Sequence, residues 1–417
     1  MNTKTYLFIC MTGALISLSS CSDNDSPNSL TVEGTGPQPL VKINLTAEQQ
    51  GFVGNTNEFA FSLARAVDAT TVGDNMNVSP VSVAYVLGML LNGADGDTRA
   101  QIADALGFGQ TDVKTVNEYF RTLLEGAAEV DKTTEIYIAN AIIANRGFNI
   151  KPTFSETVAS YYDARTETCD FATEDVAGKV NNWAREKSEG NIPEIIDKVS
   201  DDALMYALNA VYFMGSWETV FDSSLTLEET FTTEDGKSLN IKMMHDVRPV
   251  YYAADEMYSI VRLPYGNSGW SMEVLLPAKG KSVDDVLNTL DAASWNKAMA
   301  SLSLYSVDIA LPRFDFNSSL QLEAPLRSMG ITDAFDNILA RFSNLSDQAT
   351  FVSKFIQKTQ ISVNESGTEA AAVTVAEMSD AMALPLDDAT FHADRPFVFV
   401  ITENTTGTIY FIGTKKR

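Results

Sequence analysis

The chain has 417 residues, 45% of them apolar, so it can bury a large core and is not disordered by composition. Its 55 acidic residues outnumber its 30 basic ones, which gives a formal net charge of −25. Such a charge repels phosphate and anionic lipid, so we expect no nucleic-acid partner and no heparin-like activator. The basic run Lys415–Arg417 ends the chain, and we predict that it is a short solvated tail.

The first two dozen residues have the pattern of an export signal. Lys4 precedes the apolar run Tyr6–Leu18, which is too short to span a bilayer and is typical of a signal peptide. The run ends in Leu-Ser-Ser-Cys21, which resembles a bacterial lipobox, in which the cysteine is acylated. The alternative is an ordinary signal peptide with a chance cysteine. We therefore expect residues 1–20 to be a lipoprotein signal peptide and Cys21 to be lipidated.

A polar stretch follows this cysteine. Residues 22–26 are acidic, similar to the surface-export signal of some diderm bacteria, and the composition predicts a flexible tether over residues 21–44. We expect an outer-membrane lipoprotein that faces outward, attached to the membrane only through its lipid, with one domain over residues 45–417. Cys169 is the only cysteine of that domain and lies in an acidic stretch, so we expect an inert thiol.

Periodicity predicts helices in the first half of the body and strands in the second. The turn Asn77–Pro80 is expected to start a helix, with Ser79 as its cap. The other helices are expected at 46–68, 98–106, 152–162, 175–188 and 318–329. Strands are expected at 134–144, 205–213, 258–263, 271–276 and 306–312, with a final hairpin of 396–402 and 408–414. This order favours an α+β fold.

The sequence offers little catalytic chemistry. It has no His-Glu-x-x-His, no Gly-x-Ser-x-Gly and no phosphate-cradling glycine loop, and its cysteines lack the spacing of metal ligands. We therefore expect no cofactor and no metal. The two histidines, His245 and His392, are predicted to be structural. An enzyme stays open at this point, because a catalytic triad is not visible in sequence order.

The most informative stretch is 365–385. At period two over residues 367–377, one face carries only small uncharged side chains, and all charge falls on the other face, which is typical of a half-buried strand. Three successive alanines favour a helix, so an Ala-rich helix or loop is the alternative. The uncharged face consists of Thr368, Ala370, Ala372, Thr374 and Ala376.

At this point the chain resembles the serpins. The resemblance covers nearly all of residues 50–417 and rests on several motifs in order. The hinge signature is matched by Glu365, Gly367, Thr368, Glu369, Ala370, Ala371 and Ala372. The other matching motifs are Asn77–Ser82 with Gly93–Thr98, Asn209–Trp217, Leu311–Phe314 with Leu326–Phe335, and Ala393–Phe397 with Thr406–Gly413.

The resemblance implies a monomeric protein with three β-sheets, about nine helices and an exposed reactive-centre loop over about 365–390. It also implies inhibition rather than catalysis. A target protease attacks the loop and forms an acyl-enzyme through its own nucleophile. The freed loop then inserts into the central sheet as an extra strand.

Counting along the family's loop from Glu365 places the reactive bond at Ala381–Met382, with Met378 and Asp380 as alternative positions. No Lys or Arg lies between residues 359 and 394, so a trypsin-like protease is a poor target. Elastase-like serine proteases are the expected targets, and papain-like cysteine proteases come second. The remaining alternatives are a non-inhibitory serpin used for binding and a surface hydrolase or glycan-binding lipoprotein.

The resemblance also implies a sheet-opening region made of Ser79, Ser82, Asn209, Trp217 and Gln357. Gln357 stands where serpins usually have a histidine, and its amide can still bond groups such as Asn209 and Ser82. Ser79, Ser82 and Asn209 could equally be ordinary caps and core polar residues. Trp217 is core packing under either interpretation.

Overall fold

The computed structural model describes residues 39–71, 73–368 and 386–417. By its contacts the chain divides into Met1–Gly36 and Pro37–Arg417, and only the second unit contains described residues. The predicted signal peptide and Cys21 therefore lie outside the described residues. Among the helices that the structure describes, none combines the length and hydropathy needed to cross a bilayer.

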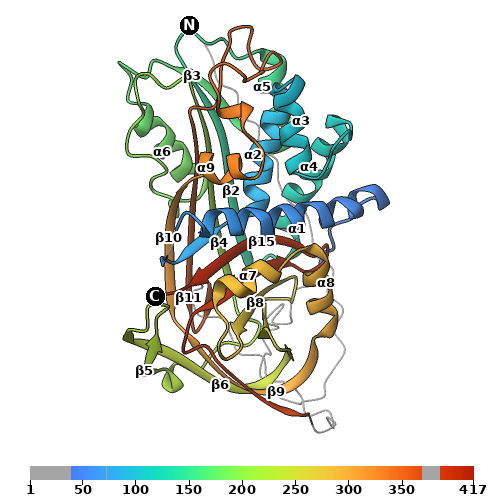
Figure 1. Cartoon of the computed structure of the whole chain (residues 1–417), viewed down its shortest axis with the longest axis vertical. Coiled ribbons are helices and arrows are strands. Elements are labelled where there is room, and N and C mark those ends of the chain that lie inside the picture. Colours follow the sequence, from blue (N-terminus) through green and yellow to red (C-terminus); the bar gives the residue numbers. More distant parts are fainter. Residues whose placement is uncertain (1–38, 72, 369–385) are drawn as a thin grey trace, which may run out of the picture. The chain divides into compact units, whose positions relative to one another are not determined.

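The helices gather mainly in the first half of the body, as predicted (Figure 1). The described residues contain nine α-helices and two short 3-10 helices. They are α1 (Ala47–Asp68), α2 (Pro80–Gly93), α3 (Gly96–Ala105), α4 (Val113–Val130), α5 (Pro152–Tyr162), α6 (Val176–Lys187), α7 (Val283–Thr289), α8 (Ala292–Ser301), α9 (Glu323–Ser328), η1 (Ser223–Leu225) and η2 (Asp333–Phe335).

The smaller of two sheets has six strands in the order β10-β11-β12-β4-β2-β3. Its strands are β2 (Thr134–Asn145), β3 (Arg165–Cys169), β4 (Met205–Ser216), β10 (Phe314–Gln321), β11 (Lys354–Asn364) and β12 (Gly367–Thr368). Its long strands β2 and β4 are antiparallel over their whole length. Figure 1 shows these long strands running side by side behind α2.

The larger sheet has nine strands in the order β1-β15-β14-β8-β7-β6-β9-β13, with β5 also paired to β6. Because β6 pairs in turn with β5, β9 and β7, two of the three sheets implied by the resemblance join here into one ladder. The strands are β1 (Met76–Val78), β5 (Leu227–Thr232), β6 (Ser238–Ala254), β7 (Tyr258–Tyr265), β8 (Trp270–Pro277), β9 (Ser303–Pro312), β13 (Asp388–His392), β14 (Phe397–Glu403) and β15 (Thr408–Lys415).

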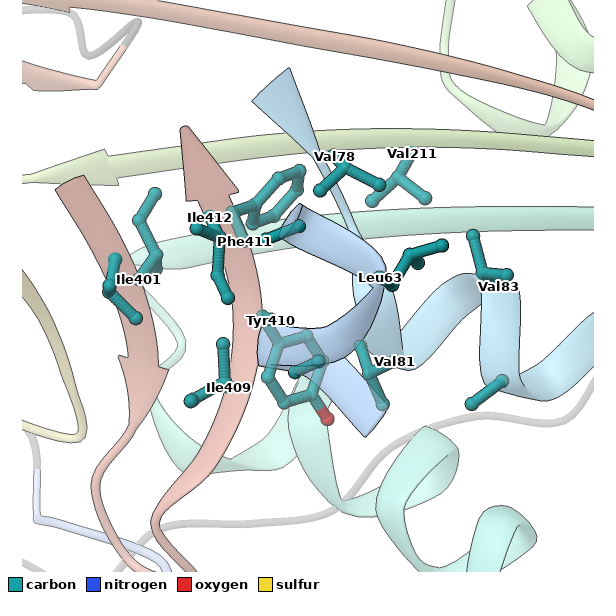
Figure 2. Close-up of a cluster of buried hydrophobic side chains, with 14 of the residues drawn as sticks. Leu63, Val78, Val81, Val83, Val211, Ile401, Ile409, Tyr410, Phe411 and Ile412 are labelled. Carbon is teal, nitrogen blue, oxygen red and sulfur yellow. The ribbon is translucent and has the colours of Figure 1, made fainter. Parts of the chain in front are cut away.

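The main core lies where α1 and α2 cover the larger sheet (Figure 2). Leu63 of α1 and Val81 and Val83 of α2 belong to the same buried cluster as Ile409 and Phe411 of β15, which are fully buried. The predicted C-terminal hairpin is thereby confirmed, and it lies inside the sheet between the edge strand β1 and β8. Burial of each such side chain contributes about 1.5–3 kcal/mol to the free energy of folding, relative to leaving it exposed.

Two predictions about local structure are wrong. The helix expected over 318–329 is strand until Gln321, because Phe314 and Phe316 alternate with polar residues and β10 pairs with β11 throughout. Ser79 does occupy the N-cap position of α2, but its side chain makes no capping hydrogen bond. Its backbone N–H instead donates to the side chain of Gln357.

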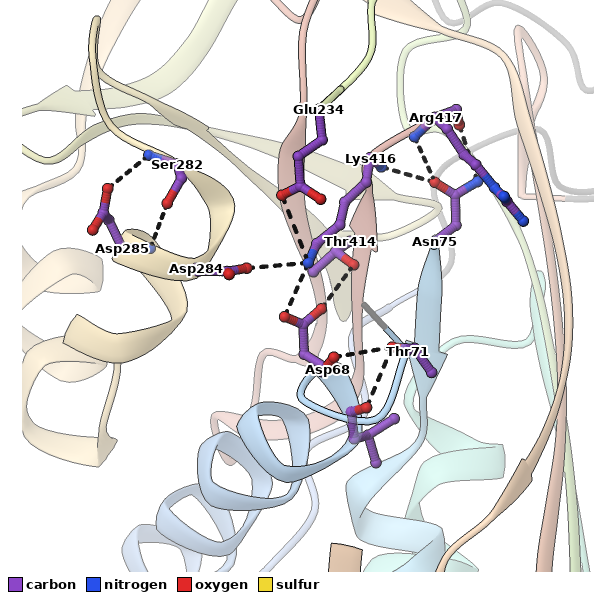
Figure 3. A network of polar contacts seen from close by, with 11 residues as sticks. Asp68, Thr71, Asn75, Glu234, Ser282, Asp284, Asp285, Thr414, Lys416 and Arg417 are labelled. Atoms are coloured by element: carbon purple, nitrogen blue, oxygen red, sulfur yellow. Dashed lines mark hydrogen bonds and ion pairs between the residues drawn. The ribbon is translucent and has the colours of Figure 1, made fainter. Parts of the chain in front are cut away.

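The end of the chain is also not the solvated tail that its charge predicted (Figure 3). Lys416 is only 2% exposed, and its Nζ lies 3.0 Å from Asp68 and 3.1 Å from Asp284. Asn75 accepts hydrogen bonds from the backbone N–H groups of Lys416 and Arg417. The tail was misjudged because the carboxylates that surround it come from distant parts of the sequence.

The predicted tether also contacts the body near its end. The backbone N–H of Val41 donates to the carbonyl of Val130, and that of Ile43 donates to the hydroxyl of Thr405. The contacts with the body therefore begin before residue 45, where the domain was predicted to start.

Candidate functional site

The predicted hinge enters the smaller sheet as the two-residue strand β12. Gly367 and Thr368 pair antiparallel with Asn364 and Val363 of β11 on one side. On the other side they pair antiparallel with β4, at residues 215 and 216. The start of the loop therefore already separates the ends of two strands of the sheet.

Beyond this short strand the sheet is closed. Residues 354–360 of β11 pair directly and in parallel with residues 206–212 of β4. Parallel pairs are slightly less stable per residue than antiparallel ones. We call the boundary between β4 and β11 the slot, of which β12 occupies one end.

Thr368 is fully buried and is held by an aromatic pair. Its hydroxyl lies 2.7 Å from the hydroxyl of Tyr265. Burial raises the pKa of Tyr265 far above its ordinary value, so this phenol stays neutral. The ring of Tyr265 stacks on Trp217 with centroids 4.4 Å apart, and the indole N–H donates to the carbonyl of Asn364 at 2.9 Å.

Position 367 in the slot can hold only a glycine. Its φ is +141°, and a Cβ there would lie 2.1 Å from the carbonyl oxygen of Gly215. No side chain fits at that distance, so a glycine is needed for the hinge to enter between β4 and β11.

Glu365 fixes the turn that leads into β12. Its carboxylate accepts hydrogen bonds from Arg313 at 2.7 Å and from the hydroxyl of Thr226 at 2.5 Å. Burial alone would raise the pKa of Glu365, but these two donors hold the pKa below its ordinary value. The carboxylate is therefore charged at neutral pH and anchors the hinge.

A network of fully buried polar side chains crosses the middle of the slot. The amide of Gln357 on β11 donates to the side-chain oxygen of Asn209 on β4 at 2.8 Å and to the carbonyl of Ser79 at 2.9 Å. The hydroxyl of Ser82 donates to the same oxygen of Asn209. The network ties both strands of the slot to the start of α2.

The network continues on both sides of Gln357. Asn209 donates to Asn140 on β2 at 2.8 Å, and Asn140 donates to the carbonyl of Tyr162 at the end of α5. On β11, the hydroxyl of Thr359 accepts a hydrogen bond from the side-chain amide of Asn77 and donates one to the backbone carbonyl of Asn77. Separation of β4 from β11 would have to break the Gln357–Asn209 hydrogen bond, and the start of α2, which is bonded to both residues, would lose its contacts with one of them.

The structure brings together eight of the residues that the sequence singled out. Those at the slot are Glu365, Gly367, Thr368, Ser79, Ser82, Asn209, Trp217 and Gln357. Glu369, Ala370, Ala371, Ala372, Met378, Asp380, Ala381 and Met382 lie outside the described residues.

Sequence reasoning missed five contributors: Arg313, Thr226, Tyr265, Asn140 and Thr359. Arg313 and Glu365 are 52 residues apart, and neither shows its partner in the sequence. Tyr265 ends a strand that was predicted only as far as residue 263. The alternation of buried and half-buried residues along β11 was a usable signal for Thr359 and Gln357, which share its core face.

The remaining reactive side chains do not form a catalytic site. Burial raises the pKa of the Cys169 thiol to about 11, so it is inert as predicted. His245 contacts Glu229 at 2.9 Å and His392 contacts Asp308 at 3.1 Å, on strands of the larger sheet. Among the described residues, no group of three or more His, Cys, Asp or Glu side chains could hold a metal ion.

Known proteins are similar to this chain in both sequence and fold. The family model described as "Serpin (serine protease inhibitor)" matches residues 54–415. A leukocyte elastase inhibitor of Sus scrofa is 33% identical over 372 residues, which cover 85% of this chain and 96% of the relative. That of Equus caballus is 32% identical over 382 residues, which cover 88% of this chain and 98% of the relative.

Solved structures agree with these relatives. The thermophilic serpin tengpin in its native state matches with a TM-score of 0.81 and 30% identity, over 91% of this chain and 97% of that chain. The family match, the relatives and the fold all cover the hinge and the slot. The chain therefore belongs to the serpin family of serine protease inhibitors.

Proposed function

We propose that this serpin traps elastase-like serine proteases as a suicide substrate. The protease attacks the bond Ala381–Met382 in the loop that follows β12 and forms an acyl-enzyme. It is then displaced when the loop inserts into the slot. The observation that supports this most strongly is β12, because Gly367 and Thr368 already lie antiparallel between β4 and β11. Insertion is then the extension of an existing strand.

The side chains along the slot suit such an extension. If both registers of β12 continue, Ala370 meets Phe213 and Ile361, which are fully buried. In the same registers Thr374 comes between Asn209 and Gln357. The inward positions from Ala370 to Ala376 are small and uncharged, so they enter without overpacking and without burying a charge.

Insertion would also improve the pairing of the sheet. The parallel contact between β4 and β11 would be replaced by two antiparallel ladders, one on each side of the loop. About a dozen new backbone hydrogen bonds at ~1 kcal/mol net each give a gross gain on the order of 10 kcal/mol. The intact protein is then held above its relaxed state by a kinetic barrier.

The choice of target follows from the loop's composition and from the relatives. The absence of Lys and Arg between residues 359 and 394 deprives a trypsin-like pocket of its cation. Ala381 and Met382, at the proposed reactive bond, suit the small apolar pocket of elastase-like proteases. The two relatives named above are leukocyte elastase inhibitors. Papain-like cysteine proteases are the second class to test.

The test is incubation of the protein with an elastase. We expect a covalent complex that survives SDS, and a fragment that begins at Met382. That fragment contains β14 and β15, which lie inside the larger sheet, so it should separate only on denaturation. An elastase whose catalytic serine has been blocked is the control and should give no complex. Digestion of the loop without complex formation would overturn the proposal.

We also propose that the protein is exported and anchored at Cys21. The apolar run and the lipobox-like residues support this, and the polar stretch after them supports exposure on the outer surface. Growth with labelled palmitate should label the protein, and Cys21→Ala should abolish the label. Labelling of both proteins alike would exclude this cysteine as the anchor.

A further inference from the structure

One face of the larger sheet presents large apolar side chains to solvent near its edge. Val247 and Tyr251 of β6 are 67% and 49% exposed, and Leu304 of β9 is 46% exposed. Single exposed apolar residues are normal on protein surfaces, whereas apolar patches mark interaction sites. The question is therefore whether these three residues form one surface.

The strand register places them together. Tyr251 is directly opposite Leu304, and Val247 is directly opposite Asp308. Directly paired residues have their side chains on the same face of a sheet, and residues two or four apart along a strand share that face. The three apolar side chains therefore lie on one face of β6 and β9, which we call the β6–β9 face.

This face continues onto the strand that follows the reactive loop. Asp308 is directly opposite Thr390 of β13, and Ser306 is opposite Asp388. β13 is the edge strand of the larger sheet, and Thr390 and Asp388 are exposed. The β6–β9 face is thus next to the point where the chain re-enters the body after its loop.

Chain length limits how far a bound protease can be from this face. Asp388 is six residues after Met382, and an extended residue spans at most ~3.3–3.6 Å, so the reactive bond lies within about 20 Å of Asp388. A protease that holds this bond in its active site must bring the surface around that site over this edge of the sheet. The docked protease is therefore the partner that the position of the face favours.

We propose that the β6–β9 face is a second docking surface for the target protease, outside the reactive loop. This inference rests on the function proposed above. The surface of the protease that fits it is apolar with basic groups at its border, because the side chains of Asp308 and Asp388 flank the apolar residues. Contacts of this kind stabilise the first encounter, before the loop is cleaved.

The test compares a triple variant with a matched control. Val247→Ser, Tyr251→Ser and Leu304→Ser together remove the apolar surface. Ile338→Ser with Leu339→Ser removes two residues that are 75% and 51% exposed elsewhere. These two follow η2, which contacts α3 through Gln101 at the opposite end of the body from β6 and β9 (Figure 1).

The measured quantity is the second-order rate constant for formation of the SDS-stable complex with an elastase. We expect the triple variant to react about tenfold more slowly, since a few buried contacts dominate most interfaces. Its melting temperature and stoichiometry of inhibition should equal those of the wild type, and the control should react at the wild-type rate. The wild-type rate should also fall as salt is added.

The outcomes separate this inference from the proposed function. If the wild type forms no complex at all, the proposed function fails. If the wild type forms the complex and the triple variant forms it equally fast, only the docking surface is overturned. Sedimentation of the wild type and the triple variant tests whether a second copy of this chain binds the face instead. If the wild type self-associates and the triple variant does not, the face is assigned to a second copy and the proposal is overturned.

Discussion

The side-chain amide of Gln357 donates a 2.8 Å hydrogen bond to Asn209 across the boundary that the inserting loop would have to open. The two residues are directly paired in the sheet, and both are fully buried. A buried amide that loses its partner is costly, so this contact opposes separation of β4 from β11. In the register of β12, Thr374 would arrive at this position and supply a hydroxyl to both amides.

Replacing Gln357 by alanine should therefore weaken the closed slot. Gln357→Ala leaves the backbone N–H of Ser79 and the oxygen of Asn209 without one partner each, so we expect a loss of about 1–3 kcal/mol in the free energy of unfolding. Inhibitory activity should also decay faster on warming. Urea unfolding and timed elastase assays measure both effects. Gln321→Ala, at a surface position, is the control and should change neither.

If the loop inserts in the register of β12, a charged side chain at position 374 should block insertion. Thr374→Arg would place a guanidinium between Asn209 and Gln357, where its burial costs several kcal/mol. We expect this variant to be cleaved by elastase as a substrate, with little covalent complex on SDS gels. Glu369→Arg is the matched control, because that position faces away from Thr368, and it should still form the complex. Equal complex formation by the two variants would contradict this register.

The buried ion pair of Lys416 should stabilise the folded protein at neutral pH. Lys416→Met leaves Asp68 buried without its cation, so we expect a loss of about 3 kcal/mol in the free energy of unfolding. Burial alone would lower the pKa of Lys416, but Asp68 and Asp284 hold it above its ordinary value. The stabilisation is therefore present below the unfolded pKa, about 10.4, and is lost as pH rises through the folded value. Urea unfolding curves of variant and wild type should converge as the pH rises through the folded pKa of Lys416; a constant gap would refute the pairing.

The neighbouring Lys415 should destabilise the folded protein at neutral pH, in contrast to Lys416. Burial lowers the pKa of Lys415 to about 8, so the folded protein carries a disfavoured charge below that pH. Lys415→Met should raise the free energy of unfolding at pH 7 by about 1 kcal/mol, since the contact of the ammonium with Phe231 offsets part of the burial. The gain should shrink between pH 8 and the unfolded pKa of about 10.4. A variant less stable than the wild type at pH 7 would show that the favourable contacts of the ammonium, with Phe231 and with the carbonyl of Arg417, outweigh its burial.

Local signals predicted much of the fold. The helix α1 has a capping box at Thr46 and Gln49, and the hairpin of β14 and β15 has a turn sequence between two apolar runs. The helices α7 and α8 were missed although both carry capping boxes, at Ser282 and Asp291, because they are short and lie among strands. Periodicity is weak in segments of this length.

The site was predictable as a set of residues but not as a geometry. The hinge motif indicated Gly367 and Thr368, yet their pairing with β4 depends on residues about 150 positions earlier in the chain. The burial of Lys416 likewise depends on Asp68, which is far away in sequence. Pairings between distant segments leave no local pattern, so the sequence alone does not reveal them.

The position of the C-terminal hairpin has a consequence for biosynthesis. β15 is among the last segments to be translated, yet β1 and β14 both pair with it and α1 packs on it. Until β14 and β15 have been translated, β8 and β1 each lack one neighbour, and α1 lacks the strand against which it packs most extensively. Such long-range pairing slows folding and leaves the nascent chain prone to aggregation. This serpin therefore completes its core only once β15 has been made, and a chain truncated before β15 would leave α1, β1 and β14 each without one neighbour.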